Sequence, residues 1–327
     1  MKMFLISDNI DTYTYPGAAR ARVFRLKGWS FVKARSHSVR KNEILHAYLF
    51  ISPFFLLFII FQLYPLIWSF VLGFYKWNGL TNKVFVGLSN YRQLMGDQQF
   101  WTTMENTLWY VLANILITLP ISVLLGMLLC SRGLKCGRAY KTILVLPYVT
   151  STVAAGIIFS MLFSTHFGVI NGILAQLGIA PVGWLNTMKW SKVPVIILSV
   201  WRNTPWYMLI VMSALLGVDM NLYEAARIDG ANALQRMFFI TLPCIMPVLM
   251  FCLMNLTIDS VRIFTEPYIL TSGGPGASSM SVIQYLYTSA FDTFKMGYAS
   301  AMGYILTLFL VFVSVFYFKT LRRQSGV

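Results

Sequence analysis

The segment AYLFISPFFLLFIIFQLYPLIWSFVLG, residues 47–73, carries no charged side chain. An α-helix needs about 20 such residues to cross a hydrocarbon core of about 30 Å, because each residue advances the helix by about 1.5 Å. Further apolar segments of similar length follow along the chain. We therefore predict six membrane-spanning helices, at 47–73, 106–130, 143–163, 193–216, 244–263 and 299–318.

The composition agrees with this prediction. Of the 327 residues, 57% are hydrophobic and 11% are charged, whereas roughly a quarter of the residues in a soluble domain are charged. A water-soluble fold of this length cannot remove so much apolar surface from water. The sequence therefore predicts an all-α integral membrane protein.

The basic residues predict how the helices are oriented. Nine of the 26 Lys and Arg residues precede the first span, and a cytoplasmic N-terminus places 18 inside, six in outer loops and two within spans. This bias is the one that the positive-inside rule describes. We expect a multi-pass protein with both termini in the cytoplasm, and we attribute the net charge of +15 to anchoring on anionic lipid rather than to nucleic acid.

Three regions follow from these assignments. A basic cytoplasmic arm covers residues 1–46, and the six-helix membrane domain covers 47–320. That domain includes a cytoplasmic loop at 217–243, and a cytoplasmic tail follows at 321–327.

The sequence offers no catalytic constellation of its own. The glycine-rich segment 272–279 lacks the Lys followed by Ser or Thr that a phosphate-binding P-loop requires. The four cysteines show no CxxC spacing and no histidines at metal-site intervals, so we expect reduced thiols. We predict a non-catalytic chain that binds neither a metal nor a cofactor itself.

The loop contains the most informative stretch, NLYEAARIDGANALQRMFFITLP at residues 221–243. Asn221 followed by Glu224 has the spacing of a capping box, which predicts a helix that begins there. Gly230 interrupts this helix, because glycine accepts a positive φ at little cost. A second helical run with an apolar stripe follows, and Pro243 marks the start of the fifth span. Such a helix–turn–helix element suits docking, although any cytoplasmic loop can contain a short amphipathic helix.

The same stretch resembles the EAA loop of ABC-importer permeases, whose pattern is Glu-Ala-Ala, three residues, Gly, nine residues, Ile-x-Leu-Pro. The matching positions here are Glu224, Ala225, Ala226, Gly230, Ile240, Leu242 and Pro243. Shorter motifs are similar to the carbohydrate branch of that family, the maltose-permease group. These motifs are YLFISP at 48–53, YP at 64–65, FVGLSNY at 85–91, FW at 100–101, NT at 106–107 and LTSGGP at 270–275.

The resemblance implies the fold and partners of a type I (MetI-like) importer permease that takes up a sugar or oligosaccharide across a bacterial cytoplasmic membrane. The implied partners are a second homologous permease, two ATP-binding subunits that hold ATP and Mg²⁺, and a periplasmic or extracellular solute-binding protein. The loop would contact an ATP-binding subunit. The residues implied in this coupling contact are Glu224, Ala225, Ala226, Asp229, Gly230, Ile240, Leu242 and Pro243.

One departure from the maltose-permease group limits what the resemblance implies. The maltose permease itself carries a large inserted outer domain and two additional N-terminal helices, whereas the outer loop before the second span is short here. The identity of the sugar is therefore not inherited from that permease.

Polar residues inside the fourth and fifth spans are candidates for the translocation pathway. A charged group within a span costs at least ~2.5 to 3.5 kcal/mol, so it usually faces a cavity or a partner. Spacings of three and four residues place these side chains on one helical face in each span, and the resemblance to the maltose-permease group identifies these faces with its sugar-contacting surface. The candidates are Ser199, Arg202, Asn203, Trp206, Leu256, Asp259, Ser260 and Ile263.

Two interpretations of Arg202 stay open. Arg202 and Asp259 either form a structural ion pair or line the pathway, while Trp206 suits stacking on a pyranose ring. If Arg202 is unpaired, its planar fork suits a carboxylate, which favours an acidic oligosaccharide as the solute. Glu266, at the outer end of the fifth span, is expected to be solvated.

Two other classes of function explain less of the sequence. An intramembrane enzyme needs a nucleophile with a base or paired carboxylates at membrane depth, and Asp259 stands alone there. A proton-coupled secondary transporter often shows two repeated halves, which the sequence does not, and it leaves the loop unexplained. The secondary transporter is kept as the alternative to the importer permease.

Overall fold

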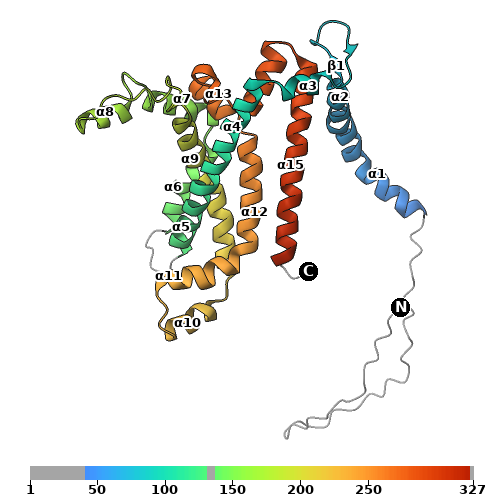
Figure 1. The fold of residues 1–327 in the computed structure, drawn as a ribbon. Helices are drawn as coiled ribbons and strands as arrows, with labels where there is room; N and C mark the ends of the chain where they lie inside the picture. Colours follow the sequence, from blue (N-terminus) through green and yellow to red (C-terminus); the bar gives the residue numbers. More distant parts are fainter. Residues whose placement is uncertain (1–40, 131–136, 325–327) are drawn as a thin grey trace, which may run out of the picture. The chain divides into compact units, whose positions relative to one another are not determined.

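The computed structural model describes residues 41–130 and 137–324, which are mostly helical (Figure 1). The chain divides into two compact units, Met1–Ile59 and Ile60–Val327. The described part of the first unit is α1 (Lys41–Phe58) and the first residue of a π-helical turn, η1 (Ile59–Leu63). Most of the predicted arm lies outside the described residues, as do the last three residues of the predicted tail and Cys136.

The second unit is a bundle of long helices with short helices at its two ends (Figure 1). Its strands, β1 and β2, form a small antiparallel hairpin in which Tyr75 is opposite Phe85. The elements in chain order are α2 (Tyr64–Leu72), β1 (Tyr75–Lys76), β2 (Val84–Phe85), α3 (Ser89–Met95), α4 (Gln98–Ala113), η2 (Asn114–Thr118), α5 (Leu119–Cys130), α6 (Gly137–Val149), α7 (Thr152–Leu162), α8 (Val169–Gln176), α9 (Lys192–Leu216), α10 (Met220–Ile228), α11 (Ala233–Arg236), η3 (Met237–Thr241), α12 (Leu242–Val261), α13 (Thr265–Thr271), η4 (Pro275–Ala277), α14 (Val282–Tyr287), η5 (Thr288–Asp292) and α15 (Met296–Gln324).

The predicted membrane spans correspond to long apolar helices. Among the described residues, five helices are long and apolar enough to cross a membrane, and a bent pair gives a sixth. The five are Tyr48–Leu72, Gln98–Cys130, Lys192–Leu216, Ala233–Val261 and Met296–Thr320. The all-α membrane fold predicted from the sequence is confirmed.

The third predicted span, 143–163, is a bent pair rather than one helix. The axes of α6 and α7 differ by 93°. At the bend, Thr150 Oγ1 donates to the carbonyl of Pro147 (2.8 Å), and Ser151 Oγ accepts from the amide of Ala154 (3.5 Å). These side chains bond the backbone groups that a helix end leaves free, so one helix stops and the next begins. The prediction of a continuous helix is corrected accordingly.

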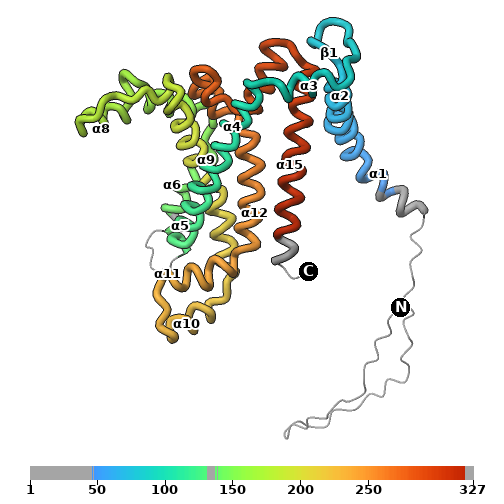
Figure 2. Tube along the Cα trace, in the orientation of Figure 1, coloured from blue at the N-terminus to red at the C-terminus, as the bar shows by residue number. Residues whose placement is uncertain are grey.

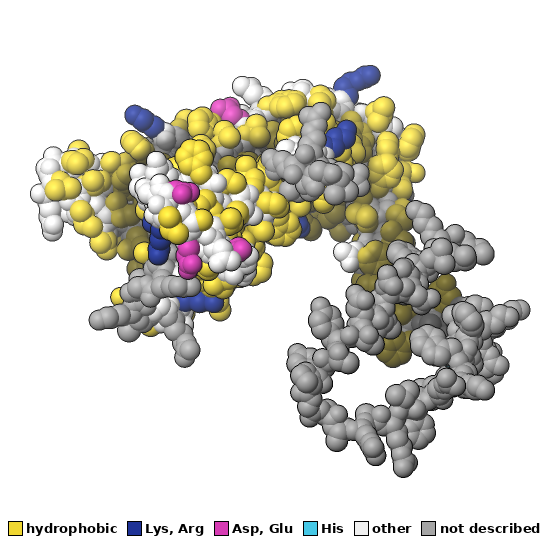
Figure 3. All heavy atoms as spheres, turned by 90° about the horizontal axis from the view of Figure 1, so that it is seen from below, with side chains coloured by type: hydrophobic (Ala, Val, Ile, Leu, Met, Phe, Trp, Pro, Cys, Tyr) yellow, Lys and Arg dark blue, Asp and Glu magenta, His cyan; other side chains and the backbone are white. Residues whose placement is uncertain are grey.

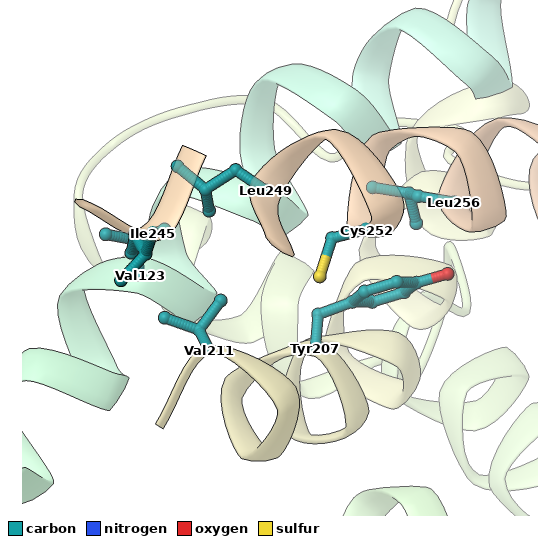
Figure 4. Close-up of a cluster of buried hydrophobic side chains, with 7 residues drawn as sticks. All are labelled: Val123, Tyr207, Val211, Ile245, Leu249, Cys252 and Leu256. Carbon is teal, nitrogen blue, oxygen red and sulfur yellow. The ribbon is translucent and has the colours of Figure 1, made fainter. Parts of the chain in front are cut away.

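The main core lies where α5, α9 and α12 pack together. Figure 4 shows Tyr207 of α9 beside Cys252 and Leu256 of α12. Gly126 lets α5 approach α9, because a Cβ atom there would lie 3.3 Å from Val211 Cγ1. Small residues commonly allow such close helix packing in membranes. The buried residues of this cluster are Val123, Tyr207, Val211, Ile245, Leu249, Cys252 and Leu256.

A polar cluster, which we call the Asp97 clasp, joins three helices. Asp97 caps α4 by accepting from the amides of Gln99 (2.9 Å) and Phe100 (3.4 Å). Its Oδ2 also accepts from the hydroxyls of Tyr285 on α14 (2.5 Å) and Tyr298 on α15. Burial raises the pKa of Asp97, but these hydrogen bonds outweigh burial and hold the pKa below its ordinary value. The clasp holds the start of α4 against α14 and α15. Within the bundle, α15 lies beside α12 (Figure 2).

The described surface is largely hydrophobic. Figure 3 shows one face of the molecule, seen from below relative to Figure 1. On this face, outside the residues drawn in grey, hydrophobic side chains predominate and a few acidic and basic side chains lie among them. In the last span, Met296–Thr320, only 17% of the most apolar window is buried within the chain. The remaining apolar surface must face lipid or a partner protein, because water would penalise it.

Candidate translocation face and coupling loop

A π-helical turn in the second span brings polar groups against α9. Asn114 Oδ1, at the start of η2, accepts from Thr118 Oγ1 (3.2 Å) and from Ser199 Oγ (3.1 Å). Asn203 Nδ2 donates to Ser199 Oγ (3.2 Å), and Asn114 Nδ2 donates to the carbonyl of Tyr110 (3.0 Å). This network, which we call the Asn114 network, ties the polar side of α9 to the second span. Single π-helical turns are frequent at functional sites.

The structure divides the eight predicted pathway residues into two sets. Leu256 belongs to the main core, so its contacts are made within this chain. The buried set is Ser199, Leu256, Ser260 and Ile263. The open set, whose side chains retain exposure, is Arg202, Asn203, Trp206 and Asp259. Only the open set offers surface to a solute in this conformation.

Trp206 already has an aromatic partner. Its ring stacks on Tyr148 of α6, with centroids 5.1 Å apart and planes inclined by 15°. Trp206 is nevertheless 41% exposed. One ring face is covered and the other is available, so the predicted stacking on a pyranose ring is geometrically compatible with this arrangement.

Arg202 pairs with Glu266, and this corrects two expectations. Arg202 Nη1 lies 3.8 Å from Glu266 Oε1, and Glu266 is buried rather than solvated. Burial raises the pKa of Glu266, and the charge of Arg202 opposes that shift only in part. Arg202 Nε is also buried without a hydrogen-bond partner in the described part of the chain. The ion pair between Arg202 and Asp259, one of the two alternatives that the sequence left open, is not formed, because α13 turns back and places Glu266 next to α9.

Asp259 is held by a tyrosine instead. Tyr207 Oη donates to Asp259 Oδ2 at 2.9 Å, and this hydrogen bond links α9 to α12. Asp259 remains exposed on its other side. One side of this intramembrane carboxylate accepts a hydrogen bond and the other side is exposed. It is therefore available to a hydroxyl-bearing solute or to a partner helix.

The first helix of the coupling loop, α10, begins two residues earlier than predicted. Asp219, not Asn221, is the N-cap of α10, and its Oδ1 accepts from the amide of Asn221 (3.0 Å). A carboxylate is favoured there because it bonds a free amide and faces the positive end of the helix dipole. A capping box does occur, but at Asn232 and Gln235, where it starts α11. The predicted capping box at Asn221 and Glu224 is corrected.

The turn and the second limb follow the predicted pattern with one difference. Gly230 has φ +78°, and a side chain there would meet no atom within 4 Å, so backbone conformation alone favours glycine. The helix then runs without a break from Ala233 to Val261. Pro243, which lacks an amide hydrogen, follows the π-helical turn η3, and Thr241 Oγ1 bonds the carbonyl of Arg236 (3.2 Å). Pro243 therefore lies within the span helix rather than before it.

The predicted coupling residues form an outward surface. No residue of α10 is buried in this chain. Ala226, Ile240 and Leu242 are half-buried. The exposed members of the predicted set are Glu224, Ala225, Asp229, Gly230 and Pro243.

Sequence reasoning missed several residues that organise the site. Asn114, Tyr207 and Glu266 each hold a predicted pathway residue in place. Asn114 carried a usable signal, since a polar residue in the middle of an apolar span normally has a partner inside the bundle. The sequence around Tyr207 and Glu266 gave no such signal, because the partners of these two residues come from segments that are distant in the chain.

Comparison with known proteins gives consistent matches over most of the chain. The family model described as "Binding-protein-dependent transport system inner membrane component" matches residues 106–324. A lactose transport system permease protein of Rhizobium radiobacter is 32% identical over 293 residues, which cover 88% of this chain and 98% of that protein. An arabinooligosaccharides transport system permease protein of Bacillus subtilis is 36% identical over 282 residues, or 85% of this chain and 89% of that protein.

A solved structure shares the fold. It is described as a bacterial alginate ABC transporter in complex with alginate pentasaccharide-bound periplasmic protein. One of its chains matches with a TM-score of 0.74 and 23% identity, over 87% of this chain and 96% of that one. At this identity the likeness concerns the course of the helices and not the solute.

Proposed function

Because the chain belongs to the family of binding-protein-dependent transport system inner membrane components, we propose that it forms half of the translocation pathway of an ATP-driven sugar importer. The resemblance to carbohydrate ABC-importer permeases and the fold predicted from it are confirmed. The chain is thus a multi-pass membrane permease.

The observation that carries the proposed mechanism is that α10 has no buried residue and that Glu224 and Ala225 are exposed. A nine-residue helix with no buried residue gains little stability from its own chain. It nevertheless presents Glu224 and the adjoining alanines outward, followed by a turn that Gly230 permits. We propose that an ATP-binding subunit covers this surface and that its movement on binding ATP reaches the membrane through α12.

The proposed solute is a neutral sugar or oligosaccharide. The relatives include permeases named for lactose and for arabinooligosaccharides. An acidic solute was favoured only if Arg202 were unpaired, and Glu266 lies 3.8 Å from it. With this positive charge offset, the open set presents an amide, an indole ring and the Asp259 carboxylate, which suit hydroxyl groups.

The proposed assembly contains four kinds of subunit. A second homologous permease completes the pathway, two ATP-binding subunits hold ATP and Mg²⁺, and an extracytoplasmic solute-binding protein delivers the sugar. The permease itself is non-catalytic in this scheme. Both of its termini face the cytoplasm, as the distribution of Lys and Arg favours.

Reconstitution separates this proposal from the alternative of a proton-coupled carrier. The chain would be placed in liposomes with a second permease and the ATP-binding subunits, with labelled lactose, arabinotriose or maltose and the solute-binding protein outside. We expect uptake that requires enclosed ATP and the solute-binding protein. Uptake by the chain alone, driven by a proton gradient, would contradict the importer and support the secondary transporter.

A further inference from the structure

A groove of about 600 Å³ lies between the coupling loop and the bundle. Five elements form its walls: Met127 comes from α5, Leu215 from α9, Met220 from α10, Ala233 from α11 and Met237 from η3. Its lining is mainly apolar. Ligand pockets in proteins span roughly 300 to 1,000 Å³, so this groove has the size to hold part of a lipid-sized molecule.

Two arginines give the groove its charge. Arg227 of α10 and Arg236 of α11 both line it, and none of the described residues that line it is acidic. Neither arginine forms an ion pair within residues 41–130 and 137–324. An apolar groove with two unneutralised cations complements a molecule that is apolar along one part and anionic at one end.

The groove lies on the side of α10 that faces its own chain. Met220, Tyr223 and Arg227 are spaced three and four residues apart and therefore share one face of the helix. Tyr223 Oη also bonds Thr241 Oγ1 at 3.0 Å, which ties this face to η3. Leu222 and Ala225 point to the opposite side. A molecule in the groove would leave that outer side free for a partner protein.

We infer that the groove binds an anionic phospholipid from the leaflet at this end of the bundle. The phosphate group lies between Arg227 and Arg236, and an acyl chain follows the methionine- and leucine-lined walls. A site of this kind makes the position of α10 depend on the lipid. The inference needs only that the chain is embedded in a membrane, and it does not depend on the solute or on ATP.

Lipid titration of the purified complex, followed by native mass spectrometry, tests this site. The full chain with its partner subunits would be delipidated in detergent and titrated with dioleoyl phosphatidylglycerol or dioleoyl phosphatidylcholine. The double variant Arg227→Gln, Arg236→Gln should bind phosphatidylglycerol roughly tenfold more weakly or worse, since each basic residue near the headgroups adds several-fold to anionic lipid binding. Binding of phosphatidylcholine should not change.

A matched control removes the same charge elsewhere. Arg92 is exposed on α3, far along the chain from the groove, and Arg92→Gln should leave the preference for phosphatidylglycerol intact. Equal loss in this control, or no loss in the double variant, would overturn the site. Full competition by glycerol phosphate, which has no acyl chain, would likewise overturn it by showing that the groove takes a free anion.

Two further variants keep the test decisive if the double glutamine variant fails to assemble. Arg227→Lys with Arg236→Lys preserves the charge and should keep most of the lipid preference. Met237→Trp fills the groove without changing charge and should weaken phosphatidylglycerol binding; full affinity in that variant would overturn the inference. All of these readouts are binding measurements, so a negative result would leave the proposed transport function untouched.

Discussion

The translocation face and the coupling loop both carry polar side chains. Those of the translocation face have partners within the chain, whereas the charged side chains on α10 of the loop are exposed. Along α9, Asn114 bonds Ser199, Tyr207 bonds Asp259 and Glu266 pairs with Arg202. Along α10, the charged side chains are exposed and form no ion pair in the described part of the chain.

The environment explains this difference. Within a membrane no water is available to satisfy a polar group, so the chain itself must supply the partner. Outside the hydrocarbon region a charged side chain can stay hydrated until another protein covers it. The first region is therefore preorganised by this chain, whereas the second remains exposed, as the proposed contact with an ATP-binding subunit requires.

Among the variants that test this difference between the two regions, charge reversal at Glu224 should have the largest effect on transport. Glu224→Lys reverses a charge in the surface that we propose an ATP-binding subunit covers, and the loss of a central contact at a protein interface typically exceeds about 2 kcal/mol. We expect ATP-dependent uptake to fall by roughly thirtyfold or more, or the ATP-binding subunit to dissociate. Uptake in liposomes and co-purification would measure the two outcomes.

Asp292→Lys is the matched control for this variant. Asp292 is also exposed, but it belongs to η5, which precedes α15 and lies outside the loop. This charge reversal should leave uptake close to that of the unchanged protein. Normal, ATP-coupled uptake by the Glu224→Lys variant would remove the distinction between the two regions.

Breaking the Asn114 network should destabilise the permease without affecting the loop. Asn114→Leu leaves Ser199 and Thr118 without their buried acceptor, and an unsatisfied buried group costs about 1 to 3 kcal/mol. We expect a lower Tm of the assembled complex in detergent. Asn255→Leu, at a residue whose amide bonds only the carbonyl of Phe251 in its own helix, should lower the Tm much less. Equal shifts would mean that the network has no special role.

Glu266→Gln should expose the charge of Arg202 to the pathway. The pair is 3.8 Å apart and Arg202 is 30% exposed, so we expect a stability loss of only about 1 kcal/mol. The solute preference should move towards acidic sugars, because a guanidinium without its carboxylate partner suits an anion. Competition of uptake by uronic-acid oligosaccharides would measure this change.

Arg202→Ala completes that pair of variants. It should alter the preference among neutral solutes while the complex still assembles. An unchanged preference in both variants would assign the Arg202–Glu266 pair to packing alone.

The smallest effect is expected at the Asp97 clasp. Its carboxylate has a pKa below the ordinary value of about 3.9, so the ionised form contributes stability above that pH and loses it as the pH falls through the lowered pKa. Tyr285→Phe removes one hydrogen bond to this carboxylate and should cost about 1 kcal/mol at pH 7. The difference in Tm should shrink below about pH 4. A difference independent of pH would show that Asp97 is not the partner that matters.

The sequence predicts the helices better than their contacts. Apolar length located the spans, and the Glu224 to Pro243 pattern located the loop, because both signals are local in the chain. The bend between α6 and α7 was missed, since Thr150 and Ser151 are compatible with a helix until their hydroxyls bond the backbone. The N-cap of α10 was misplaced because Asn221 and Asp219 are both good capping residues.

The ion pair of the candidate site was the least predictable feature. The sequence indicates that Arg202 needs a partner or a cavity within the membrane region, but the only ion pair it suggested was with Asp259, one of two alternatives left open. The actual partner, Glu266, follows the end of α12 and returns to α9 through the turn into α13. That turn depends on packing between α13 and α7, which no local pattern encodes.

A single helix, Ala233–Val261, connects the coupling loop to the membrane region. Its 29 residues span about 44 Å, and its backbone hydrogen bonds continue past Pro243. A tilt of the end that follows Gly230 is therefore expected to move the end that carries Asp259. The helix can bend at the π-helical turn and at Pro243 and Pro247, which lack an amide hydrogen. In the proposed importer, bending at these points determines how much of the loop's movement reaches the residues around Asp259.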